Sequence, residues 1–176
     1  IDIKDLGPVT RFNGVDIQQT ATFIKMSNET YIEKIVQEHE WMVKDYHIPN
    51  QVIPMNDDKE YLNKLETAKG PEQEEEKVAI QRRMNFNYRQ AIGELIFAMI
   101  TCRPDISFPV IKLSQYSQNP AEIHYKAVIQ VFQYLHATKH KGIIYWRKYK
   151  NTMLPDIQLT LSDQVGFDEG HVDDND

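Results

Sequence analysis

The chain has 176 residues, 41% of them hydrophobic and 10% aromatic, which is enough for one ordinary domain or two small ones. No apolar run approaches the roughly 20 residues that a membrane-spanning helix needs, so no membrane partner is expected. The net charge of −6 argues against attraction of nucleic acid by the whole surface. Cys102 is the only cysteine, which excludes an intrachain disulfide and favours an intracellular protein.

The first predicted elements are two strands that form a hairpin. Residues 1–8 are a lead-in, and the apolar residues of 9–17 predict a strand. Gly14 interrupts that strand, which indicates a bulge or a position where another backbone comes close. A polar link at 18–21 leads to a second predicted strand over 22–26.

A series of helices follows the hairpin. Ser27 is the predicted N-cap of the first helix, because its hydroxyl can accept from a free backbone N–H of the first turn. The strongest helical pattern covers 88–101, which is apolar over a wide face and is therefore expected to be buried. Pro104 suits the first position of the next helix. The predicted helices cover residues 28–42, 58–69, 72–84, 88–101, 104–113 and 120–138.

The whole pattern predicts an α+β fold in three parts. These are an N-terminal hairpin over residues 1–27, a helical bundle over 28–142, and short C-terminal strands with an acidic tail over 143–176. The strands at 143–146 and 157–161 are expected to start a second sheet. The helical core is predicted to contain Ile92, Leu95, Ile96, Val110, Leu113, Val128, Phe132 and Leu135.

Basic residues gather near the end of the last predicted helix, with aromatic residues between them. This basic cluster consists of Lys139, Lys141, Arg147, Lys148 and Lys150, and Tyr145, Trp146 and Tyr149 lie within it. Such a cluster is suited to a nucleic-acid strand, because the cations neutralise phosphates and the rings stack on bases or pack on sugars. An equally weighted interpretation is a solvated helix end and strand with Trp146 in the core.

Several short motifs, in order and at matching spacing, resemble Ty1/Copia-type retrotransposon reverse transcriptases. The resemblance covers the region after the catalytic Tyr-x-Asp-Asp turn up to the start of the RNase H domain. It rests on Lys4-Asp5-Leu6-Gly7-Pro8, Phe12 to Ile17, Tyr31-Ile32, Tyr88-Arg89, Ile92-Gly93, Leu95, Arg103-Pro104-Asp105-Ile106, Leu113-Ser114, Asn119-Pro120, His124, Tyr134-Leu135, Thr138 and Gly142. Since the chain also begins at Ile1 and not at methionine, we expect a fragment, a processed product or an incomplete gene model.

The resemblance implies an RNA-directed DNA polymerase in the parent protein, with Mg²⁺ bound by carboxylates of a turn that this chain does not contain. We therefore expect no catalytic residue, no cofactor and no polymerase activity for this chain alone. In the parent, the 28–142 region would be thumb-like, and Phe12, Gly14 and Val15 would belong to a primer grip that holds template–primer. The alternative for these three residues is an ordinary edge hairpin. The family pattern has Leu at position 13, where Asn13 is poorly suited to a buried strand.

The segment Leu161-Ser162-Asp163 resembles the start of the family's RNase H domain, and Asp163 matches the first metal-binding Asp of that domain. The partner carboxylates of that site are missing, so Asp163 is expected to be an orphan ligand. The expected partners are an RNA/DNA template–primer and the polymerase and RNase H portions, in the cytoplasm, in a virus-like particle or in the nucleus. The alternative function is a host-co-opted nucleic-acid-binding or protein-interaction domain without enzymatic activity.

Overall fold

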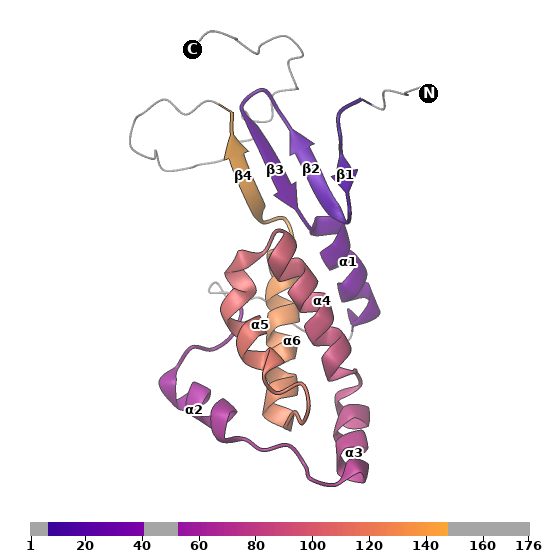
Figure 1. The fold of residues 1–176 in the computed structure, drawn as a ribbon, viewed down its shortest axis with the longest axis vertical. Helices are drawn as coiled ribbons and strands as arrows, with labels where there is room; N and C mark the ends of the chain where they lie inside the picture. Colours follow the sequence, from indigo (N-terminus) through magenta and orange to yellow (C-terminus); the bar gives the residue numbers. More distant parts are fainter. Residues whose placement is uncertain (1–6, 41–52, 148–176) are drawn as a thin grey trace.

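The computed structural model describes residues 7–40 and 53–147, which form an α+β fold as the sequence predicted. The strands are β1 (Arg11–Phe12), β2 (Val15–Gln19), β3 (Phe23–Ser27) and β4 (Gly142–Trp146). The helices are α1 (Glu29–Glu38), α2 (Lys59–Thr67), α3 (Glu74–Met84), α4 (Tyr88–Thr101), the 3₁₀ helix η2 (Pro104–Ile106), α5 (Ser107–Ser114) and α6 (Glu122–Ala137). The sheet stands at one end of the helices (Figure 1). Within the described residues no helix is long and apolar enough to cross a bilayer.

The stretch predicted as one strand over 9–17 is two strands joined by a tight turn. β1 pairs antiparallel with β2, with Phe12 opposite Val15, so that Asn13 and Gly14 form a two-residue turn. Both turn residues have positive φ, 47° and 80° respectively. Asn followed by Gly is the favoured pair for such a turn, because both tolerate the left-handed region. Gly14 is therefore a turn residue and not a bulge, and Asn13 occupies no buried strand position.

The strand predicted at 143–146 does not start a second sheet. As β4 it joins the first sheet beside β3, antiparallel, with Phe23 opposite Trp146 and Ser27 opposite Gly142. The sheet order is β1-β2-β3-β4. β4 supplies the partner that the edge of β3 would otherwise lack, and unpaired strand edges are unfavourable. The prediction at 157–161 lies outside the described residues.

Side-chain caps begin α2, at Asp58, and α4, at Asn87. Asn87 caps α4, because its Oδ1 accepts from the backbone N–H of Gln90 at 3.1 Å. The predicted cap Ser27 is instead the last residue of β3, and the N-cap position of α1 belongs to Asn28. The Asn28 side chain makes no cap; its Nδ2 donates to Thr101 Oγ1 at 2.7 Å and so joins α1 to the end of α4.

The core lies between α1, α4, α5 and α6, and it contains almost all of the residues that the sequence placed there. Ile96 is the exception, since 36% of its surface is exposed. α4 buries a stripe that includes Ala91, Leu95 and Ala98, and residue 96 lies beside that stripe. The other predicted core residues, Ile92, Leu95, Val110, Leu113, Val128, Phe132 and Leu135, are buried.

Candidate nucleic-acid interface

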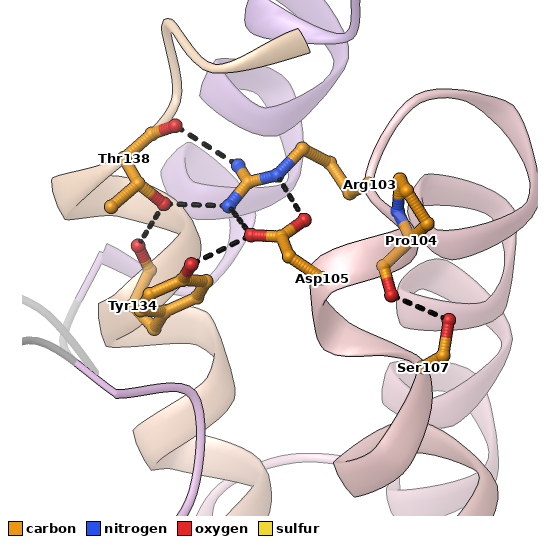
Figure 2. Close-up of polar contacts among 6 residues, drawn as sticks. All are labelled: Arg103, Pro104, Asp105, Ser107, Tyr134 and Thr138. Carbon is orange, nitrogen blue, oxygen red and sulfur yellow. Dashed lines mark hydrogen bonds and ion pairs between the residues drawn. The ribbon is translucent and has the colours of Figure 1, made fainter. Parts of the chain in front are cut away.

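A buried arginine organises the junction between the sheet and the helices. Arg103 follows α4 and is only 1% exposed. Its Nε and Nη2 donate to the two carboxylate oxygens of Asp105 at 2.9 and 2.8 Å, a bidentate pair. Its Nη1 and Nη2 also donate to the backbone oxygen and Oγ1 of Thr138 at 3.0 and 2.6 Å (Figure 2). Arg103 thereby ties the end of α4 to η2 and to the last turn of α6.

Tyr134 completes this network from α6. Its hydroxyl donates to Asp105 Oδ2 at 2.6 Å (Figure 2). Burial alone would raise the pKa of Asp105, but the hydrogen bonds from Arg103 and Tyr134 outweigh it, and the pKa lies below its usual value. Burial, together with the Asp105 carboxylate, raises the pKa of Tyr134. Asp105 is therefore an ionised acceptor with Arg103 and Tyr134 as its donors.

A pocket of about 400 Å³ opens beside the Arg103 network, between the end of α6 and strands β3 and β4. Two lysines from distant parts of the chain line this pocket. Lys25 belongs to β3, and Lys141 is the residue directly before β4. The Lys141 ammonium lies 5.6 Å from the centre of the Tyr134 ring, within range of a cation–π interaction. The pocket is lined by Lys25, Cys102, Arg103, Pro104, Asp105, Tyr134, His140, Lys141, Gly142, Ile143 and Ile144.

The lining of the pocket is positively charged. Asp105 is its one carboxylate among the described residues, and Arg103 already neutralises that carboxylate. Lys25 and Lys141 remain as uncompensated cations, with no carboxylate within ion-pair distance in residues 7–40 and 53–147. An acidic protein thus carries a locally basic pocket, and such a local charge distribution governs binding of anions more than the net charge does.

The structure separates the residues of the basic cluster. Lys141 lines the pocket, whereas Lys139 turns to α1 and forms an ion pair with Glu33, whose hydrogen bond raises the pKa of Lys139. Arg147 follows β4, and its Nε donates to the backbone oxygen of Thr20 at 2.9 Å. The remaining predicted cations, Lys148 and Lys150, lie outside the described residues.

Of the eleven described residues that line the pocket, Lys141 is the one that the sequence predicted as a nucleic-acid contact. Lys25 was not predicted, and its signal in the sequence is a single charge within the otherwise uncharged strand Phe23–Ser27. His140, in the link between α6 and β4, was not predicted as a contact either. No group of three or more metal-ligating side chains occurs in the part of the chain that the structure describes, and Asp163 lies outside it.

The residues proposed for the primer grip surround the β1–β2 turn. Phe12 is 65% exposed, whereas Val15 is buried. Gly14 faces its own helix α4, because a Cβ at this position would lie 3.3 Å from Cζ of Phe97. The ion pair from Arg11 to Asp16, at 2.8 Å, joins the two strands of the hairpin. The hairpin therefore rests on α4 through Gly14 and leaves the Phe12 ring open to solvent.

His124 lies in the first turn of α6, where it is buried. Its Nδ1 accepts from the backbone N–H of Ala121, and its Nε2 therefore carries the proton that bonds to the oxygen of Leu65, both at 2.8 Å. The imidazole also stacks on the ring of Tyr116, with 3.9 Å between the ring centres. His124 thus fastens the end of α2 to the start of α6.

Over most of its length, this chain is similar to two proteins encoded by transposons. A stretch of 139 residues, 78% of this chain, is 30% identical to the Retrovirus-related Pol polyprotein from transposon TNT 1-94 of Nicotiana tabacum. A stretch of 144 residues, 81% of the chain, is 28% identical to the putative transposon Ty5-1 protein of Saccharomyces cerevisiae. The chain is similar to part of a retrotransposon Pol polyprotein.

The similarity covers only a fraction of these longer relatives. The chain spans 10% of the tobacco polyprotein and 41% of the yeast protein. A shorter stretch of 63 residues is 33% identical to the secreted RxLR effector protein 161 of Plasmopara viticola and covers 44% of that protein. No protein-family model and no solved structure matches the chain.

Proposed function

We propose that this chain is a template–primer-contacting, noncatalytic part of a retrotransposon reverse transcriptase. The observation that carries the proposal is the basic pocket, which Lys25 and Lys141 both line beside the buried Arg103 network in an acidic chain. Ammonium groups at such a position bind phosphates, which provide most of the affinity in contacts between proteins and nucleic acids. The similarity to Pol polyproteins over 78% of the chain supports the same assignment.

The catalytic step belongs to another part of the parent polymerase. Nucleotide addition requires two metal ions held by carboxylates. The 176 residues contain no Tyr-x-Asp-Asp turn, and within the described residues no cluster of acidic, histidine or cysteine side chains is arranged to hold a metal. The role of this chain is to hold the nucleic acid against the sheet and the helices, while Mg²⁺ acts elsewhere in the complete enzyme.

The experiment measures the binding of a fluorescein-labelled RNA–DNA primer–template to the full chain by fluorescence anisotropy. We expect weak binding that falls as salt rises, because released counterions contribute the driving force. Primer extension with Mg²⁺ or Mn²⁺ is expected to yield no product. Absence of binding at low salt would contradict the template–primer role, and extension that persists through stringent purification would contradict the noncatalytic role.

A further inference from the structure

The two lysines of the pocket are held where a ligand can reach both. Lys25 lies opposite Ile144 in the β3–β4 pair, so the two side chains share one face of the sheet. Lys141 comes from the other wall, where the Tyr134 ring supports its ammonium. The backbone pairing of β4 with β3 and the Arg103 network fix both walls. Both lysines therefore line the pocket on parts of the backbone that are already held in place.

The one carboxylate of the lining does not compete with a ligand for these lysines. Asp105 accepts from Arg103 Nε, Arg103 Nη2 and the Tyr134 hydroxyl. Three donors occupy its oxygens, and its charge is balanced by a guanidinium that is 1% exposed. By contrast, Lys139, only two residues before Lys141, is already neutralised by Glu33. Within residues 7–40 and 53–147, the pocket thus has two lysines without a carboxylate partner, in a region where Arg103 and Lys139 are paired.

The chemistry of the lining fits a phosphate group attached to an apolar or sugar-like body. A lysine ammonium is a compact charge with three N–H donors, so it can donate to a phosphate oxygen from many directions. Ile143 and Ile144 add apolar surface next to them, and a volume of about 400 Å³ admits more than a bare phosphate ion. We propose that this pocket binds a backbone phosphate of a nucleic-acid strand, with Lys25 and Lys141 as the direct ligands. The choice of nucleic acid as the source of the phosphate rests on the proposed function.

The test compares two variants that remove the same charge. The pocket variant, Lys25→Ala with Lys141→Ala, removes both lysine charges from the pocket lining. The control variant is Lys34→Ala with Lys59→Ala, because both control lysines are exposed and neither has a carboxylate partner among the described residues. Binding of a labelled single-stranded oligodeoxythymidine is measured at several salt concentrations. In parallel, the methyl signals of Ile143 and Ile144 are followed by NMR, first with the oligonucleotide and then with inorganic phosphate.

We expect the pocket variant to make the slope of log affinity against log salt shallower by about one unit for each lysine. The oligonucleotide should shift the Ile143 and Ile144 methyl signals in the wild type and in the control, but not in the pocket variant. Lys25→Arg with Lys141→Arg should retain both effects, because the charges remain. This charge-preserving variant and the melting temperature of every variant distinguish loss of the phosphate contact from unfolding of the protein.

Three results would overturn the inference. Equal salt slopes in the pocket variant and the control would place the phosphate contacts elsewhere, while the proposed template–primer role would stand. Unshifted Ile143 and Ile144 signals during saturable oligonucleotide binding would have the same meaning. Methyl shifts with inorganic phosphate, in a protein that binds neither oligonucleotide nor primer–template, would leave a site for free phosphate and refute nucleic acid as its ligand.

Discussion

Replacing Gly142 with alanine perturbs the point where β4 meets β3. A Cβ at Gly142 would lie 2.2 Å from the backbone oxygen of Met26 and 2.9 Å from Cβ of Ser27. Neither atom belongs to the flexible end of a side chain, so the two strands must separate to relieve the contact. Overpacking of this kind costs about 1–3 kcal/mol. The separation also moves the wall of the pocket that Gly142 and its neighbours form.

Gly93 provides the matched control for this substitution. It lies within α4, and a Cβ there would meet no heavy atom within 4 Å. Alanine is a better helix former than glycine by roughly 1 kcal/mol, so Gly93→Ala is expected to stabilise the protein. The same chemical change should therefore have opposite signs at the two positions.

Urea denaturation followed by circular dichroism measures both effects. The midpoint should fall for Gly142→Ala and rise for Gly93→Ala, with similar m-values if unfolding stays two-state. In a chain of this size, a change of 1 kcal/mol corresponds to about 2–4 °C in melting temperature. An unchanged or higher midpoint for Gly142→Ala would refute the close approach of β4 to β3.

Three further predictions test the core, the buried histidine and the basic cluster. Leu95→Ala should destabilise the fold by about 2–5 kcal/mol, since Leu95 is fully buried and its truncation leaves a cavity; an unaffected denaturation midpoint would contradict that position. Burial lowers the pKa of His124 from 6.5, so its contribution to stability is present above pH 6.5 and declines as the pH falls below it. Melting temperatures across this range should show the decline, and His124→Asn should weaken it. Replacing Lys141, Arg147 and Lys148 together with glutamate should abolish primer–template binding in the anisotropy assay, and retained affinity would exclude the cluster.

Local chemistry by itself determined the bounds of the strongest helix. The prediction of a helix over 88–101 matches α4 at both ends, because the apolar pattern, the Asn87 cap and the Arg103-Pro104 stop all lie within or beside the segment. The ion pair of Arg103 with Asp105 likewise joins residues only two positions apart, whereas the bond of Arg103 to Thr138 spans 35 positions. Helix caps, helix stops and apolar periodicity can be predicted from the sequence, because they depend on residues that lie within one or two helical turns of one another.

Only the tertiary structure decided which distant residues meet. A short apolar strand at 142–146 carries no mark of its partner, and antiparallel pairing placed it against β3 and not in a second sheet. The same pairing places Lys25 and Lys141 in the lining of one pocket. The packing of α6 on α1, by contrast, places Lys139 in an ion pair with Glu33, outside the pocket lining. Charge and periodicity identify which residues can form ion pairs or enter the core. Which distant residues they contact depends on how the elements pack together, and no repeating pattern in the sequence records that packing.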